Sequence, residues 1–168
     1  MRFQIRTPCA RNKVETMLEA FKIAQTDSAT ATETIVLSYE ERKKSRHRTE
    51  TTSGKALGWF LERGHVLEND EILECSDGTL IKVEAAEESV SEVISNNAHA
   101  LTRAAYHLGN RHVPLQVSDG FLRYLHDHVL DEMVVGLGLA VTFAKKPFHP
   151  ENGAYAPGTG GHHHGHEH

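Results

Sequence analysis

The chain has 168 residues, enough for one domain or two small ones, and its 39% apolar and 24% charged residues are ordinary for a globular protein. A net charge of -5 argues against a general nucleic-acid binder, and no apolar run approaches the roughly 20 residues of a membrane span. No secretory signal is visible at the amino terminus, so we expect a cytoplasmic protein. The two cysteines, Cys9 and Cys75, lie far apart and predict reduced, structural thiols rather than a thiolate metal site.

The first half of the chain is predicted to be mostly β-structure. Helical spacing of apolar residues predicts a short helix in residues 14–24, within an N-terminal extension over residues 1–33 to which no role is assigned. Strand-like segments then follow at residues 35–39, 57–61, 71–75 and 79–85, and the charged run at 40–48 is expected to continue the first of them in extended form. Residues 34–78 are therefore expected to form a small β-rich domain.

The second half, residues 79–150, predicts alternating strands and helices. Its first strand is expected at residues 79–86, and Ser89 with Glu92 fits a capping box that begins a helix ending at Gly109. The remaining predicted elements are a hairpin of residues 113–117 and 121–125, a helix at 129–137 and a strand at 139–143. This β-α-β-β-α-β order is ferredoxin-like, and the whole chain is expected to be of the α+β class.

Residues 151–168 are rich in glycine, proline and histidine, cannot bury a core, and are expected to form a flexible tail. The chain has thirteen histidines, and five of them stand in its last seven positions: His162, His163, His164, His166 and His168. Neutral imidazole is a ligand that nickel, zinc and copper share, so metal handling is the first hypothesis. A purification tag is the alternative, although Gly165 and Glu167 interrupt the run.

Three further histidines are candidate ligands. His126 and His128 flank Asp127 at a predicted strand–helix junction, where residues two apart in an extended segment face the same side. Asp127 can also cap the following helix, and the capping and ligand roles are compatible. His112 follows a helix end, and a single exposed histidine there can meet its twin across a two-fold axis.

Other motifs, present or absent, restrict the classes of function that fit the chain. The basic run at residues 42–48 has no interleaved aromatic cluster, so a solvated strand face or a protein-docking edge is favoured over nucleic-acid binding. The chain contains neither a phosphate-binding GxxxxGK[ST] loop nor a zincin HExxH helix. A hydrolytic metal site needs rigid ligands and an open coordination position. The candidate ligands here lie at a strand–helix junction and on an expected flexible tail, which suits capture and release of a metal better than catalysis.

At this point the chain resembles the UreE family of urease accessory proteins, from about residue 35 to its carboxyl terminus. The matching segments are YHLGNRHVP at 106–114, HDHVLD at 126–131, Phe148, PE at 150–151, GAY at 153–155, YEER at 39–42, LERG at 61–64 and VEAA at 83–86. The histidine-rich tail also matches, although it is short and residues 1–33 look longer than the usual lead-in.

The resemblance implies a nickel metallochaperone with an N-terminal β-domain that contacts protein partners and a ferredoxin-like metal-binding domain that forms a homodimer. It places His112 at the dimer interface, where one histidine from each subunit binds a shared nickel ion, and His126 and His128 at peripheral sites. The tail is expected to bind further ions. The implied partners are the urease accessory GTPase and the apo-urease accessory complex, and the implied cargo is Ni²⁺, with Zn²⁺, Cu²⁺ and Co²⁺ as candidates for binding in vitro.

The leading hypothesis is therefore a binding and delivery protein, not an enzyme. Two alternatives remain open. One is a metal-dependent hydrolase that uses His126, His128 and a nearby carboxylate such as Asp131. The other is a histidine-rich zinc or copper buffer without a delivery role, which affinity alone would not distinguish because copper outcompetes nickel at most nitrogen sites.

Overall fold

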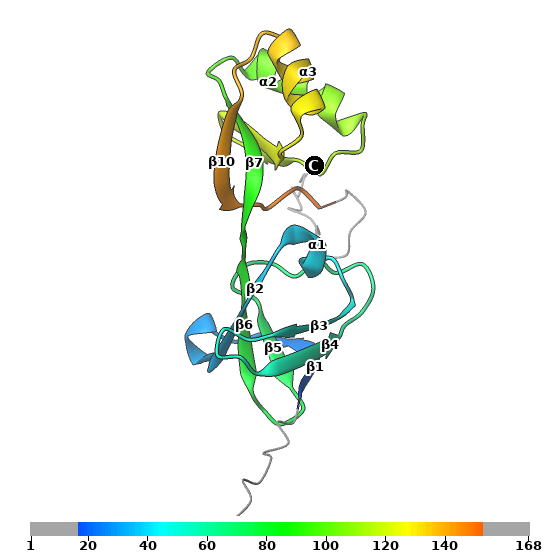
Figure 1. The fold of residues 1–168 in the computed structure, drawn as a ribbon, viewed down its shortest axis with the longest axis vertical. Coiled ribbons are helices and arrows are strands. Elements are labelled where there is room, and N and C mark those ends of the chain that lie inside the picture. The colour runs from blue at the N-terminus through cyan, green and yellow to red at the C-terminus, as the bar shows by residue number, and fades with distance from the viewer. Residues whose placement is uncertain (1–16, 153–168) are drawn as a thin grey trace, which may run out of the picture.

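The computed structural model describes residues 17–152, which form two β-sheets joined end to end (Figure 1). The first sheet contains β1 (Leu18–Ala24), β2 (Glu33–Leu37), β3 (Arg46–Glu50), β4 (Ala56–Phe60), β5 (Ile72–Cys75) and β6 (Leu80–Ala85). The second contains β7 (Glu87–Ile94), β8 (Gln116–Ser118), β9 (Phe121–Leu125) and β10 (Thr142–Pro147). The helices are α1 (Tyr39–Arg42), α2 (Ala98–Gly109) and α3 (His128–Gly136), with a 3-10 turn at Ser28–Thr30. The predicted α+β class is confirmed.

The first sheet is mixed, with the strand order β2-β6-β5-β1-β4-β3. β1 runs parallel to β4, β2 runs parallel to β6, and the other pairs are antiparallel. Its core is a cluster of side chains that are at most 4% exposed: Ala20, Ile35, Leu37, Leu57, Trp59, Leu67, Leu73, Cys75, Ile81 and Val83. Because every strand except β3 contributes to this cluster, the sheet buries one continuous apolar core.

The helix predicted for residues 14–24 is wrong, because residues 18–24 form β1 between β5 and β4. The register of β1 against β5 shifts between Ala20 and Lys22. Such an irregularity breaks the two-residue alternation of a strand. Leu18, Ala20 and Ile23 therefore all pack against the core at spacings of two and three residues, which imitates a helical stripe. Residues 18–24 belong to the first sheet rather than to an extension of it.

The second sheet is antiparallel, with the order β10-β7-β9-β8, and it follows the chain order β7-α2-β8-β9-α3-β10. Both helices pack against the sheet through one buried cluster, and Figure 1 shows them on the same side of it. The cluster joins α2, α3 and the central strands through Val93, Leu101, Ala104, Leu108, Leu115, Leu122, Tyr124, Val134 and Leu139. The part of the chain that carries His112, His126 and His128 thus has its own core.

Two predictions for the start of this half are wrong. Residues 80–85 form β6 of the first sheet, so the strand that begins the second sheet is β7. The Ser89–Glu92 pair is not a capping box: Ser89 Oγ accepts from Lys145 Nζ at 2.8 Å, and Glu92 pairs with neighbouring strands. These polar side chains serve cross-strand contacts, and α2 begins later, at Asn97.

Shorter differences concern the element ends. The run at residues 40–48 is not continuously extended, because Ser38 and Glu41 form a capping box that begins α1 before β3 starts. The strands expected at 113–117 and 139–143 lie instead at β8 and β10, whereas the strand at 121–125 and the helix expected at 129–137 are confirmed by β9 and α3. Among the described residues, no helix is long and apolar enough to cross a membrane.

Candidate metal site

His112 stands just beyond the C-terminal end of α2. Asn97 begins this helix by accepting from the Ala100 N–H at 3.1 Å, and Asn110 ends it. His112 then adopts a φ of 57°, a left-handed conformation in which histidine is several-fold enriched, and its N–H donates to the Gly109 carbonyl at 2.9 Å. Its side chain is exposed, and within residues 17–152 no hydrogen bond or ion pair involves its ring. The imidazole is therefore available to a group from outside this part of the protomer.

The surface of α2 near His112 carries exposed apolar side chains. Tyr106, one turn before Asn110, is 65% exposed and packs edge-on against His107, with the two ring centroids 5.3 Å apart. A separate shallow groove is lined by Leu101 and Ala105 of α2 and by Val117 of β8, which is 45% exposed. Aromatic residues such as Tyr106 are enriched in the centre of protein–protein interfaces.

His126 follows β9 and contacts groups from three neighbouring elements. Its Nδ1 lies 3.1 Å from Ser91 Oγ of β7 and 3.1 Å from Asp131 Oδ2 of α3. Its ring packs edge-on against Phe143 of β10, with the ring centroids 5.0 Å apart. The side chain is still 39% exposed. The ring is thus held on one edge and open to solvent on the other.

Asp131 is held in turn by Tyr124, whose buried hydroxyl donates to Asp131 Oδ1 at 2.8 Å. Burial and this carboxylate raise the pKa of Tyr124 well above its ordinary value, so the hydroxyl keeps its proton. Tyr124 and Asp131 therefore form a continuous polar contact from the core of the second sheet to the His126 ring.

Asp127 and His128 begin α3. Asp127 Oδ1 accepts from the Val129 and Leu130 N–H groups at 2.8 and 3.2 Å, which confirms its predicted capping role. His128 is the first residue of the helix and is exposed. That His126 and His128 together bind one ion stays a prediction.

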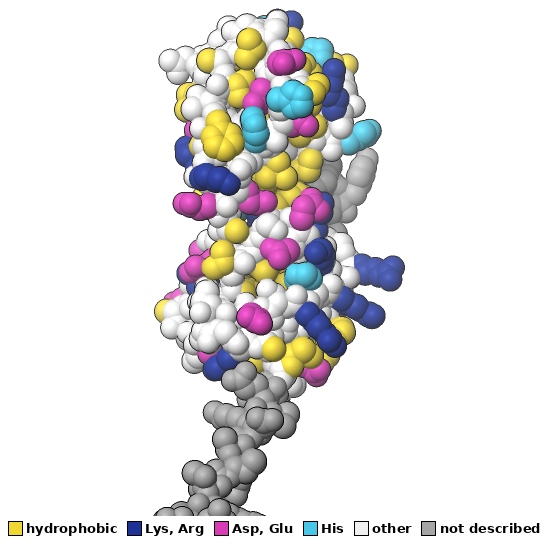
Figure 2. Space-filling view, viewed as in Figure 1, with side chains coloured by type: hydrophobic (Ala, Val, Ile, Leu, Met, Phe, Trp, Pro, Cys, Tyr) yellow, Lys and Arg dark blue, Asp and Glu magenta, His cyan; other side chains and the backbone are white. Residues whose placement is uncertain are grey.

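Figure 2 shows histidine side chains on the surface of the part that contains the second sheet, next to acidic ones. Across residues 17–152, no three histidine, cysteine, aspartate or glutamate side chains form a group that could hold a metal ion. The predicted tail ligands lie outside the described residues: His162, His163, His164, His166 and His168. Cys75 is buried, and burial together with Asp77 raises the pKa of its thiol to about 11, so it stays protonated at neutral pH.

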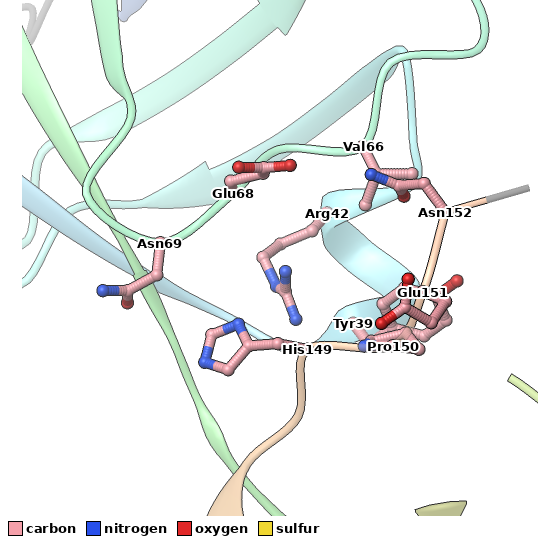
Figure 3. Close-up of a pocket in the computed structure, with 9 residues that line it drawn as sticks. All are labelled: Tyr39, Arg42, Val66, Glu68, Asn69, His149, Pro150, Glu151 and Asn152. Atoms are coloured by element: carbon pink, nitrogen blue, oxygen red, sulfur yellow. The ribbon is translucent and has the colours of Figure 1, made fainter. Parts of the chain in front are cut away.

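His149 lines a cavity of about 420 Å³ between the two sheets (Figure 3). The cavity lining consists of Tyr39, Arg42, Val66, Glu68, Asn69, His149, Pro150, Glu151 and Asn152. Arg42 is buried and donates to the carbonyls of Leu67, at 3.0 Å, and Phe148. Desolvation and the nearby Arg42 and Arg123 lower the pKa of His149. Its ring is consequently neutral at neutral pH.

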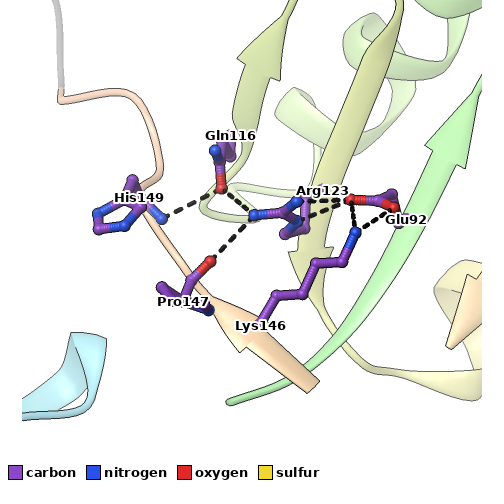
Figure 4. A network of polar contacts seen from close by, with 6 residues as sticks. All are labelled: Glu92, Gln116, Arg123, Lys146, Pro147 and His149. Atoms are coloured by element: carbon purple, nitrogen blue, oxygen red, sulfur yellow. Dashed lines mark hydrogen bonds and ion pairs between the residues drawn. The ribbon is translucent and has the colours of Figure 1, made fainter. Parts of the chain in front are cut away.

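A second polar network fixes the chain as it leaves β10 (Figure 4). Arg123 Nη2 lies 2.6 Å from Glu92 Oε2, and Lys146 Nζ lies 2.8 Å from Glu92 Oε1. These hydrogen bonds, from Lys146 first and then Arg123, lower the pKa of Glu92 despite its burial. Arg123 also donates to the Pro147 carbonyl at 3.0 Å. The segment that leads to the C-terminal tail is thereby tied to the second sheet.

The structure therefore brings His126 and Asp131 together and leaves His112 exposed at another element's end. Sequence reasoning named Asp131 as a carboxylate near the two histidines but missed Ser91 and Tyr124. Both missed residues come from strands paired with each other, at the register Ser91↔Tyr124. Only knowledge of that register would have placed them beside His126.

Comparison with known proteins identifies the family. The model of the N-terminal domain of the UreE urease accessory protein matches residues 14–86, and the model of its C-terminal domain matches residues 88–168. A urease accessory protein UreE from Teredinibacter turnerae is 62% identical over 147 residues, which cover 87% of this chain and 95% of the relative. Its counterpart from Saccharophagus degradans is 64% identical over 129 residues, covering 77% and 76%. With both domain models matched in sequence order and relatives this similar over most of their length, the chain belongs to the UreE family of urease accessory proteins.

Proposed function

We propose that this protein is a nickel metallochaperone that delivers Ni²⁺ for assembly of the urease metallocentre. Membership of a family named for its role as urease accessory proteins supports a part in urease maturation. The observation that carries the metal-handling mechanism is the exposed His112 imidazole, which has no side-chain partner among residues 17–152. Its neutral form is a strong nickel ligand.

The proposed tight site lies between two protomers. A homodimer formed through the part with the second sheet would bring two copies of His112 to one two-fold axis. The exposed Tyr106 near the C-terminal end of α2 supports contact on this face. Strand order β10-β7-β9-β8 with both helices on one face supports our assignment of this part to the ferredoxin-like class.

A site with a small number of protein ligands is suited to delivery of its ion. Two shared imidazoles leave most coordination positions of a nickel ion to water or to an incoming ligand, so the ion can pass to a second protein without unfolding the first. We propose that His126, His128 and the tail histidines bind further ions more weakly. Zn²⁺, Cu²⁺ and Co²⁺ are expected to occupy the same nitrogen sites in vitro.

We propose that the first sheet contacts the partner proteins, namely the urease accessory GTPase and the apo-urease complex, in the cytoplasm. The basic run supports this, although not as one solvated face: Arg42 is buried, whereas Arg46 and Arg48 are exposed on β3, an edge strand. An edge strand offers unpaired backbone groups beside these charges. A protein-docking edge remains the interpretation.

A hydrolase is the second candidate, because Asp131 lies against His126. Both carboxylate oxygens of Asp131 already contact protein groups, Tyr124 and His126, so this carboxylate holds the ring in place. We therefore retain a binding and delivery protein over an enzyme.

The test is size-exclusion chromatography with light scattering and metal analysis, with and without Ni²⁺, on the wild type and His112→Ala. The wild type should elute as a dimer that retains nickel, and the variant should stay a dimer but lose that nickel. A variant dimer that keeps its tightest nickel would contradict the proposed site. Nickel-dependent co-elution with the urease GTPase separates delivery from simple zinc or copper buffering.

A further inference from the structure

The contacts around His126 determine which of its two ring nitrogens carries the proton. Asp131 Oδ1 accepts from the Tyr124 hydroxyl at 2.8 Å, and Asp131 Oδ2 lies 3.1 Å from His126 Nδ1. The Ser91 hydroxyl, which lies 3.1 Å from the same Nδ1, can either donate or accept a hydrogen bond and fits both tautomers. An ionised carboxylate only accepts, and an unprotonated Nδ1 would turn a second lone pair toward it, so the short charged contact with Asp131 favours a proton on Nδ1. In the neutral ring Nε2 is then unprotonated and carries the lone pair.

The neighbouring carboxylate, Asp127, caps α3. Its Oδ1 already accepts from the N–H groups of Val129 and Leu130. Asp127 thus caps the helix, and Asp131 contacts the His126 ring. The two carboxylates have separate roles.

We propose that Asp131, anchored by Tyr124, is a positioning residue that keeps the proton of His126 on Nδ1 and so presents Nε2 to a borderline divalent cation such as Ni²⁺. This inference rests on the metal-handling function proposed above. A carboxylate on the second nitrogen of a ligating histidine is a common arrangement, which fixes the tautomer and raises the basicity of the ligand nitrogen. The edge-on contact with Phe143 fixes the rotation of the same ring.

The variant Asp131→Asn should reverse the tautomer without changing the size of the side chain. The Tyr124 hydroxyl favours the amide oxygen on its side, which turns the amide NH₂ toward His126 Nδ1. That donor needs an unprotonated Nδ1, so the ring proton moves to Nε2 and blocks the metal-binding lone pair. Tyr124→Phe should produce a smaller shift in the same direction, because the carboxylate remains but loses its anchor.

Long-range ¹H–¹⁵N correlation spectra of the full-length, metal-free protein above the histidine titration range measure this tautomer directly, with His126→Gln identifying the signals. The wild type should show a protonated Nδ1, and Asp131→Asn should show mainly a protonated Nε2. Glu132→Gln is the matched control, because Glu132 is an exposed carboxylate on the same helix turn and should leave the spectrum unchanged. A wild-type ring protonated on Nε2 overturns the proposal, and this result requires no variant to fold.

Addition of Zn²⁺ as a diamagnetic probe tests the ligand atom. The Nε2 signal of His126 should shift, and Asp131→Asn should weaken this binding by about 10-fold or more. A shift at Nδ1, or an unperturbed ring, overturns the inference but leaves the shared site at His112 standing. Conversely, a His112→Ala dimer that keeps its tightest nickel contradicts the proposed function without altering the tautomer of His126.

Discussion

His112 and His126 lie in the same part of the molecule, but their surroundings differ. The His126 ring is held by Ser91, Asp131 and Phe143 of its own chain. The His112 ring has no hydrogen-bonding partner among residues 17–152, and only its backbone is fixed, at the end of α2. One imidazole is oriented before any ion arrives, whereas the other depends on what a second molecule brings.

Under the proposed function, this difference gives the two histidines different roles. A ligand oriented by its own protomer can bind an ion in a monomer, so His126 suits a weak, always accessible site. A ligand that needs its twin binds tightly only in the dimer and can release the ion when the pair separates or a competing ligand enters. The following predictions separate these two behaviours, from the largest expected effect to the smallest.

Removal of the His112 imidazole should abolish the tightest nickel site. The loss of nickel affinity should exceed the roughly 10- to 100-fold loss that follows removal of a hydrogen-bond partner of a ligand, because here the ligand itself is removed. Calorimetric titration with Ni²⁺ measures it. His99→Ala is the matched control, because His99 is an exposed histidine of α2, the helix that precedes His112.

The backbone conformation at His112 should make the variants His112→Ala and His112→Gly differ in stability. At a φ of 57° an alanine is strained by about 1 kcal/mol, whereas glycine is not. Chemical denaturation should therefore show His112→Gly to be more stable than His112→Ala, while both lose the same nickel. Tight nickel binding that survives in His112→Gly would show that the shared-ligand account is wrong.

Acidification should affect the two sites unequally. Nickel binds neutral imidazole, so affinity is full above the histidine range, roughly pH 6 to 7, and falls as pH drops through it. A site with two imidazoles should lose roughly 100-fold per pH unit below this range, and a site with one imidazole roughly 10-fold. Titrations at several pH values give both slopes, and equal slopes would show that His126 binds its ion together with a second imidazole, such as that of His128.

Asp127→Ala should destabilise the helix beside His126 and leave His112 unaffected. The variant removes the acceptor of two N–H groups at the start of α3, a loss that costs about 1 kcal/mol. Asp127→Asn keeps a capping oxygen and serves as the control in urea unfolding. If both variants lost equal stability, the charge of Asp127 rather than its capping contact would be responsible.

Deletion of residues 159–168 should have the smallest effect on the tightest site. Five histidines of the chain lie in this segment, so the number of bound ions should fall. Affinity at the tightest site should not change, because that site is assigned to His112. Metal analysis and calorimetry together check this, and loss of the tight site would transfer that role to the tail.

Local signals in the sequence predicted one end of the second sheet well. The strand at residues 121–125, the cap at Asp127 and the helix that follows all depend on neighbours in sequence, and each is confirmed. The α+β class and the UreE family were also accessible from sequence, because the motifs around His112 and His126 are contiguous.

What failed depended on distant partners. β1 imitates a helix because of its irregular register against β5. Glu92 was interpreted as part of a cap because its partners, Arg123 and Lys146, lie on strands more than 30 residues later. Asp131 was named from the sequence, but its anchoring by Tyr124 depends on how α3 packs beside β9, which no spacing rule predicts.

Calorimetric titration of Ni²⁺ into protein lacking residues 159–168, with the protomer count fixed by light scattering, tests the central claim most directly. The tightest transition should saturate at one nickel ion for each pair of protomers and disappear in His112→Gly. Saturation at one ion per protomer, or tight binding by a monomer, would contradict a nickel ion shared between two copies of His112.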